Sequence, residues 1–202
     1  MKKKTFGALF RHGFLLAVVI YTLIPIFFTL GTSLKLFRDI ISGSLLFKPT
    51  LINYERLLNP SQSNFLRLTT NSLLIAAGTM AVVLVIASLA AYSLSRFNWH
   101  PLWNGLIQGI ILFIHMMPPV TFLSPLYLIS RALNIYDTPV AVIMGHIILT
   151  LPTAIWILLD FFAEIPKEIE EASIVDGASH FQSLTQVMLP IIQPGLASAG
   201  AL

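Results

Sequence analysis

The segment Ser72–Leu94 reads SLLIAAGTMAVVLVIASLAAYSL, and no charged residue interrupts the chain between Arg67 and Arg96. A transmembrane helix needs about 20 predominantly apolar residues to cross a hydrocarbon core about 30 Å thick. Ser72–Leu94 meets both requirements, since it is long enough and carries no charge. The segment therefore predicts a membrane-spanning helix and sets the fold class of the chain.

Three further stretches of similar length also lack charged residues apart from their edges. They place membrane spans at Phe14–Leu34, Leu102–Phe122 and Thr138–Phe162. A fifth apolar run, Ile191–Leu202, would be only about 18 Å long as a helix. We therefore expect an all-α integral membrane protein, a polytopic helical bundle with four complete transmembrane helices and the start of a fifth. We also expect the sequence to be a fragment or a truncated product of a longer protein.

The composition agrees with this fold class. Apolar residues make up 56% of the chain and charged residues 10%, and the mean hydropathy is +0.82. Soluble domains are about 45–50% apolar and about 25% charged, so a soluble globule of this length would lack the charges to solvate its surface. The net charge of +3 is too small to indicate a nucleic-acid partner. The absence of cysteine excludes disulfides and thiolate metal sites.

The basic N-terminus, Met1–Arg11, precedes the first span. A cleaved signal peptide is disfavoured, because Phe14–Leu34 is longer than a signal core and no small-residue cleavage site follows it. The 12 lysines and arginines divide evenly between the two sides of the membrane, but four of them precede the first span, which usually dominates orientation. We therefore expect a cytoplasmic N-terminus at residues 1–13, a membrane domain at 14–202 and a cytoplasmic loop at 163–190.

The sequence of that loop predicts two short helices separated by a turn. Residues 166–190 read PKEIEEASIVDGASHFQSLTQVMLP. Pro166 suits the first position of a helix, and acidic residues follow it where the helix dipole favours them. Asp176-Gly177 supplies a stop, since glycine tolerates the left-handed conformation that closes many helices. Ser179 and Gln182 match the S-x-x-Q capping box that starts a second helix.

The second helix has an apolar stripe of Phe181, Leu184 and Met188, and Leu189-Pro190 should end it. Such a stripe has two possible uses. In an arbitrary loop it more often packs on the bilayer surface or on the protein's own helices. Alternatively, it fits into a groove on a partner protein.

The loop resembles the EAA motif of ABC importer permeases: glutamate-alanine-alanine, three residues, glycine, nine residues, isoleucine, one residue, leucine-proline. The matching positions in this chain are Glu171, Ala172, Gly177, Leu189 and Pro190, with Ser173 as the third motif residue and Val187 in place of isoleucine. At average residue frequencies, an accidental match has a chance on the order of one in ten million per starting position.

The resemblance extends over essentially the whole chain. The segments Tyr21–Lys35, Asn71–Phe97, Met117–Thr138 and Pro152–Gly177 are similar to carbohydrate-type permeases, of the maltose and glycerol-3-phosphate kind. Members of that family usually have six spans in the bacterial plasma (inner) membrane, with the motif loop between the fourth and the fifth. The resemblance thus implies that most of the fifth span and the whole sixth span are missing.

The resemblance also implies a function, that of the permease subunit of an ATP-driven importer for a sugar or polyol phosphate. Its implied partners are ABC ATPase subunits, a second permease subunit, an extracytoplasmic solute-binding protein and membrane lipid, with no cofactor. The chain lacks a G-x-x-x-x-G-K-[ST] phosphate loop, so it is not expected to be an enzyme. The implied ATPase-coupling residues are Glu171, Ala172, Ser173, Gly177, Phe181, Leu184, Leu189 and Pro190.

Two histidines inside spans, His115 and His146, are candidates for the translocation path, because ionisable groups in a membrane are costly. Each could instead form a hydrogen bond within the bundle, which is the commoner role. Pro118-Pro119 and Pro125 should break the third span.

Two other functional classes remain open from the residues alone. A secondary transporter or channel would work without an ATPase. A membrane-embedded enzyme would need a clustered nucleophile and base or a set of metal ligands, and neither pattern is present in the sequence.

Overall fold

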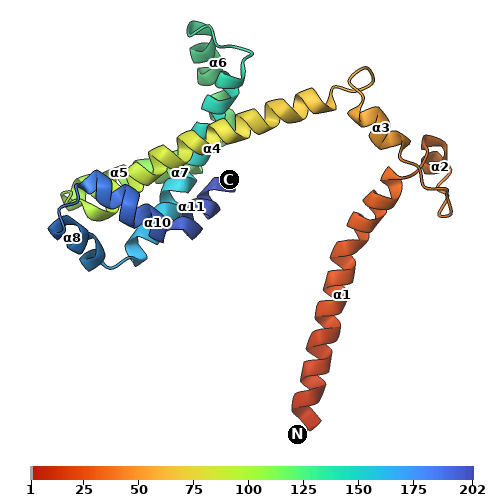
Figure 1. Cartoon of the computed structure of the whole chain (residues 1–202), viewed down its shortest axis with the longest axis horizontal. Coiled ribbons are helices and arrows are strands. Elements are labelled where there is room, and N and C mark those ends of the chain that lie inside the picture. Colours follow the sequence, from red (N-terminus) through yellow and green to blue (C-terminus); the bar gives the residue numbers. More distant parts are fainter. Residues whose placement is uncertain (1) are drawn as a thin grey trace. The chain divides into compact units, whose positions relative to one another are not determined.

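The computed structural model describes residues 2–202, which form helices and connecting loops without a β-strand (Figure 1). The chain divides into two compact units, Met1–Thr69 and Thr70–Leu202. Three helices are long and apolar enough to cross a membrane, and a bent helix pair makes a fourth candidate. The chain is therefore an all-α integral membrane protein, as its charge-free stretches predict.

The first unit consists of α1 (Lys2–Ser33), α2 (Phe37–Ile41) and α3 (Ile52–Leu58). The membrane-length part of α1 is Arg11–Ser33, close to the predicted span, and none of its most apolar window is buried within the chain. A helix that is apolar on all sides needs lipid or other helices around it. At the end of α1, the Asn53 amide donates to the backbone oxygens of Ser33 and Lys35 at 2.9 and 2.8 Å. These bonds satisfy carbonyls that the helix itself leaves free.

The second unit contains two long helices and a series of shorter ones. In chain order, its elements are α4 (Phe65–Arg96, whose first turn precedes the unit), α5 (Pro101–Met116), η1 (Pro119–Phe122), α6 (Leu123–Ala132), α7 (Pro139–Glu164), α8 (Lys167–Val175), α9 (His180–Gln182), the π-helix η2 (Ser183–Met188), α10 (Leu189–Ile191) and α11 (Gln193–Gly200). The long helices α4 and α7 confirm the spans predicted at Ser72–Leu94 and Thr138–Phe162.

The third predicted span, Leu102–Phe122, is not one straight helix. Helices Pro101–Met116 and Pro119–Ala132 meet at an angle of 99°. Met117 and Pro118 are extended between them, with ψ angles of 135° and 132°. A residue that precedes proline is driven out of the helical region by the proline ring, which explains the break. Pro125, in contrast, breaks nothing, because it lies in the first turn of α6, where its missing N–H is not needed.

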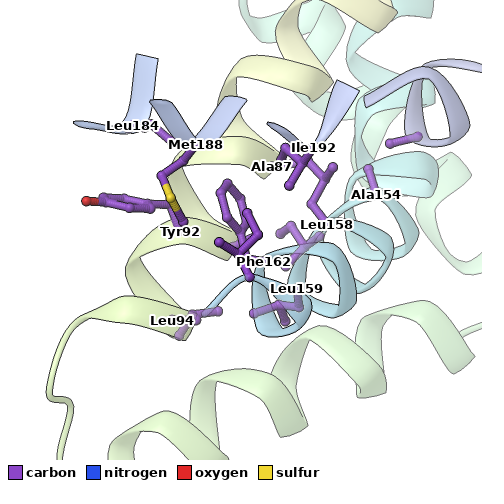
Figure 2. Close-up of a cluster of buried hydrophobic side chains, with 14 of the residues drawn as sticks. Ala87, Tyr92, Leu94, Ala154, Leu158, Leu159, Phe162, Leu184, Met188 and Ile192 are labelled. Carbon is purple, nitrogen blue, oxygen red and sulfur yellow. The ribbon is translucent and has the colours of Figure 1, made fainter. Parts of the chain in front are cut away.

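The core of the second unit lies where α4 and α7 meet the segment from η2 to α11 (Figure 2). Ala87 of α4 and Ala154 of α7 are fully buried, and small residues of this kind let membrane helices approach closely. Leu158, Phe162 and Met188 are also fully buried and fill the remaining space. The end of the motif loop is thus part of the same core as the two long helices.

The last apolar run differs from its prediction. The helical path does not end at Leu189-Pro190 but continues through α10, and it bends only at Ile192 before α11. Pro190 therefore lies inside this helical path, two residues after the end of the π-helix η2. Gly195 then allows α11 to lie against α7, because a Cβ at this position would come within 2.6 Å of the Phe161 ring.

Candidate functional site: the motif loop

The loop at residues 163–190, called the motif loop from here on, begins with α8. Pro166 stands at the N-cap of this helix, one position earlier than predicted, and Glu168 and Glu170 lie in the first turn. Asp176 is the C-cap, and Gly177 follows it with a φ of +94°. An L-residue with a side chain rarely adopts such a φ, so the turn depends on glycine. The predicted glycine stop is confirmed.

The second helix starts at the predicted capping box. The Ser179 hydroxyl accepts from the Gln182 backbone N–H at 3.3 Å, and the Gln182 side-chain oxygen accepts from the Ser179 backbone N–H at 2.8 Å. These two bonds satisfy two of the backbone N–H groups that a helix start leaves free. The helix continues from α9 into the π-helix η2, and π-turns are frequent at functional sites.

The predicted apolar stripe of the second helix is divided between two environments. Leu184 and Met188 are 3% and 0% exposed and belong to the core against α4 and α7. Phe181 is 66% exposed. Leu184 and Met188 therefore have the first of the two uses that the sequence leaves open, since they pack on the chain's own helices, and Leu184 faces the spans instead of a partner. Phe181 remains free to meet a partner.

Helix α8 also has two sides. Glu171, Ala172 and Val175 are exposed, and Val175 reaches 85%. These three residues and Phe181 are called the exposed surface of the loop. The sequence pattern had singled out three of them, but Val175 was missed because it lies outside the motif positions. Val175 lies four residues after Glu171 and three after Ala172, so the three residues share one face of α8.

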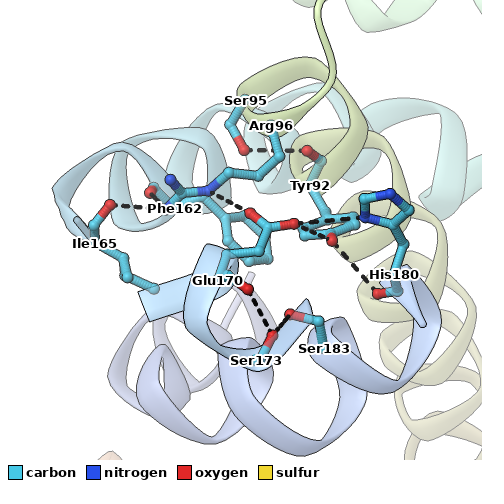
Figure 3. Close-up of polar contacts among 9 residues, drawn as sticks. All are labelled: Tyr92, Ser95, Arg96, Phe162, Ile165, Glu170, Ser173, His180 and Ser183. Carbon is cyan, nitrogen blue, oxygen red and sulfur yellow. Dashed lines mark hydrogen bonds and ion pairs between the residues drawn. The ribbon is translucent and has the colours of Figure 1, made fainter. Parts of the chain in front are cut away.

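The opposite side of α8 carries Glu170, which is 7% exposed and lies against the ends of both long helices (Figure 3). Its Oε2 atom is 3.5 Å from Nε of Arg96, the last residue of α4, and the two side chains are 9% and 4% exposed. Arg96 also donates through Nη2 to the backbone oxygens of Phe162 and Ile165, at 2.6 and 2.8 Å. One guanidinium group therefore connects α4, the end of α7 and α8.

Further hydrogen bonds surround this ion pair (Figure 3). The Tyr92 hydroxyl donates to Oε1 of Glu170 and lies 3.3 Å from the backbone oxygen of His180. The Ser173 hydroxyl is 2.8 Å from that of Ser183, so α8 is also joined to η2. Removing ions from water is costly unless they are paired and hydrogen-bonded, and this site supplies both.

Sequence reasoning missed Tyr92, Arg96 and Glu170 as a group. Tyr92 and Glu170 are 78 residues apart, and no spacing rule relates a residue at the end of one span to a residue in a later loop. The available signal was Arg96 itself, a cation at the C-terminal end of a long apolar stretch, where it can satisfy free carbonyls.

The two histidines of the spans lie apart from the loop. His115 Nδ1 is 3.2 Å from the Thr153 hydroxyl, and His146 Nδ1 is 3.0 Å from the backbone oxygen of Val142. Each histidine is therefore within hydrogen-bonding distance of a group in the helical bundle, the commoner of the two roles that the sequence leaves open. His146 also lines a cavity of about 730 Å³ between α4, α7 and the chain's last residues, together with Thr150. Among residues 2–202, no cluster of three or more potential ligands is placed to bind a metal ion.

Comparison with known proteins places this arrangement in a family. Residues 83–202 match the family model described as binding-protein-dependent transport system inner membrane component. This range includes the complete motif loop and the ends of α4 and α7 that carry Tyr92, Arg96 and Phe162.

Individual relatives are similar in sequence to this chain over most of its length. A putative ABC transporter permease protein, ORF2, of Caldicellulosiruptor sp. is 32% identical over 94% of this chain and 70% of its own length. The trehalose/maltose transport system permease protein MalG of Thermococcus litoralis is 34% identical over 77% of this chain and 55% of its own length. This chain thus spans between about half and about two thirds of these proteins.

A solved structure has the same fold. The crystal structure of a bacterial ABC transporter involved in the import of the acidic polysaccharide alginate matches all of this chain and 70% of the solved chain, with a TM-score of 0.82 and 20% identity. At this identity, the likeness extends to the fold and no further.

Proposed function

Because this chain belongs to the family of binding-protein-dependent transport system inner membrane components, we propose that it is the permease subunit of an ATP-driven importer for a sugar or related polyol phosphate. The observation that carries this proposal is the motif loop. It combines a glycine-dependent turn, an exposed surface and an inner side that is held to the two long helices through Glu170 and Arg96. Such a loop can bind a partner on one side and move membrane helices on the other.

ATP hydrolysis takes place on a partner subunit in this proposal, because the sequence has no phosphate loop. The assembly contains two ATPase subunits, a second permease subunit and an extracytoplasmic solute-binding protein, all in or at the inner membrane. The motif loop and the N-terminus then lie in the cytoplasm, where ATP is available.

The exposed surface of the loop is the part that meets the ATPase. Glu171 offers a charge to a basic or amide group, Ala172 permits close approach, and Phe181 and Val175 supply apolar area. Helices that present apolar and charged groups together bind well in grooves on partner proteins. Ser173, Leu189 and Pro190 support this surface from the chain's own side, and Gly177 sets the angle between the helices.

The sugar class follows from the relatives whose names state a substrate, such as the trehalose/maltose permease. The cavity lined by His146 and Thr150 has a volume of about 730 Å³, within the range of about 300–1,000 Å³ that small-molecule sites occupy. We propose that His146, which lines this cavity, and His115 lie along the route of the substrate. An ATPase-independent secondary transporter or channel is not favoured, because the family is one of ATP-coupled importers.

Reconstituted vesicles that contain the assembled importer test the function. Substrate delivered by the binding protein should stimulate ATP hydrolysis, and Gly177→Pro or Glu171→Lys should abolish most of that stimulation. Glu55→Lys serves as the control, because Glu55 is exposed and belongs to α3 of the first unit. Transport that persists in vesicles without the ATPase subunit would refute the proposal.

A further inference from the structure

We propose that Tyr92, Arg96 and Glu170 form a latch that transmits the movement of the ATPase-bound loop to the two long helices, an inference that rests on the proposed function. Glu170 belongs to the loop, and Tyr92 and Arg96 belong to the last two turns of α4. These three side chains act as positioning residues, since none of them faces the partner.

The latch joins three elements at one point (Figure 3). Arg96 is the last residue of α4, and its Nη2 donates to the backbone oxygens of Phe162 and Ile165, at the end of α7. These oxygens carry the partial negative charge of a helix C-terminus, which a cation stabilises. Glu170 binds the same guanidinium from α8, so a displacement of α8 acts on both long helices together.

Burial makes this connection stiff. The side chains of Arg96 and Glu170 are 4% and 9% exposed, so water cannot readily replace one partner when the other moves. Leu184 and Met188 pack on the same helices from η2 and are buried as well. The loop therefore moves with the ends of α4 and α7 and does not slide over them.

The ion pair is not fully closed in this structure. Nε of Arg96 is buried without a hydrogen-bond partner, while Oε2 of Glu170 lies 3.5 Å away. Charge-assisted N–H···O bonds are shorter, about 2.7–2.9 Å. A shift of α8 by less than about 1 Å would form this bond and satisfy the free donor. The bond between Arg96 and Glu170 is thus loose in this structure, and a small displacement of the loop toward Arg96 would tighten it.

The two adjacent glutamates have different tasks in this arrangement. Consecutive residues of a helix point in different directions, so Glu170 and Glu171 cannot both face the same neighbour. Glu170 is 7% exposed and bonded to the chain's own spans, whereas Glu171 is exposed. The first glutamate transmits the movement, and the second binds the ATPase that produces it.

The test measures substrate molecules transported per ATP hydrolysed in the reconstituted full importer. Glu170→Ala removes the ion pair and the bond to Tyr92, and Tyr92→Phe removes a single hydroxyl and leaves the ion pair. Glu170→Gln keeps groups that can bond to both Arg96 and Tyr92. Glu164→Ala is the control, because Glu164 is exposed at the end of α7.

The number of substrate molecules transported per ATP hydrolysed, called the coupling ratio, should fall at least fivefold in Glu170→Ala and at least twofold in Tyr92→Phe. Glu170→Gln should keep most of the coupling ratio of the unsubstituted importer. ATPase co-purification should stay at the level of the unsubstituted complex and of Glu164→Ala. A coupling ratio that Glu170→Ala leaves unchanged would overturn the latch. If Glu170→Ala prevents assembly, Tyr92→Phe decides, and its unchanged coupling ratio would overturn the latch equally.

Failure of the latch is distinguishable from failure of the proposed function. Glu171→Ala should reduce ATPase co-purification and leave the coupling ratio of the assembled fraction intact, the reverse of Glu170→Ala. If the unsubstituted importer neither binds an ATPase nor couples hydrolysis to transport, the proposed function fails. If it does both and the Glu170 variants behave like Glu164→Ala, the latch alone fails.

Discussion

The inner and exposed sides of the motif loop are built from the same kinds of residue but serve opposite neighbours. On the inner side, Glu170 and Leu184 are buried against α4 and α7. On the exposed side, Glu171 and Phe181 present the same chemistry, a carboxylate and a large apolar group, to the surroundings. The difference teaches that a loop of this kind needs two complementary surfaces, one for the spans and one for a partner.

Substitutions on the inner side should therefore damage the chain itself, and substitutions on the exposed side should damage only binding. This contrast gives a scale on which variants of the loop can be ordered. The largest effects belong to the buried ion pair, and the smallest belong to the helix cap.

The largest effect is expected for Arg96→Ala. It leaves the Glu170 carboxylate buried without its cation and frees two carbonyls at the end of α7. Breaking a buried pair in this way costs about 3–5 kcal/mol. Denaturation of the detergent-solubilised chain measures this loss in the free energy of unfolding. An Arg96→Ala chain as stable as the unsubstituted one would show that the inner side does not hold the loop.

Gly177→Ala should come next. The φ of +94° at this turn is costly for any residue with a Cβ, by about 1–2 kcal/mol. Gly105→Ala is the matched control, since no atom lies within 4 Å of a Cβ there and α5 gains a better helix former. The same denaturation experiment should show that Gly177→Ala destabilises the chain and that Gly105→Ala does not. Equal stability of the two variants would contradict the role of Gly177.

Phe181→Ala tests the exposed side. Because the ring is 66% exposed, its removal should leave the stability of the chain within about 0.5 kcal/mol. Affinity for the ATPase should fall about tenfold, as for an aromatic contact at the centre of an interface. Titration of the purified ATPase onto the permease complex measures this affinity. A loss of chain stability with unchanged affinity would reverse our assignment of the two sides.

Ser179→Ala should have the smallest effect. It removes one half of the capping box, the bond from the Gln182 backbone N–H to the serine hydroxyl. Loss of such a cap costs about 1 kcal/mol. Limited proteolysis of the loop should become faster, while transport stays close to normal. A loss of stability as large as that of Arg96→Ala would show that the cap, and not the ion pair, fixes the loop.

Much of the fold could be predicted because it depends on local chemistry. The charge-free stretches located α4 and α7, since apolar length alone decides whether a helix can span a membrane. The proline pair located the break before η1, and Gly177 and Ser179 located the turn and cap of the loop. Each of these signals acts within a few residues of its own position.

The rest could not be predicted because it depends on packing between distant segments. Periodicity shows that Phe181, Leu184 and Met188 lie on neighbouring faces of a helix, but not which neighbour covers each of them. Which of Glu170 and Glu171 is buried depends on the position of the last turns of α4. Tyr92, in these turns, is 78 residues before Glu170 in the sequence. Only the assembled fold decides these questions.

Cysteine cross-linking tests the central claim most directly, because the chain contains no cysteine of its own. Val175→Cys, at a position 85% exposed, should form a cross-link to the ATPase subunit of the intact importer. Ser183→Cys, at a fully buried position in the same loop, should form none. Absence of an ATPase adduct at Val175→Cys in an importer that still transports would contradict the docking of an ATPase on this surface.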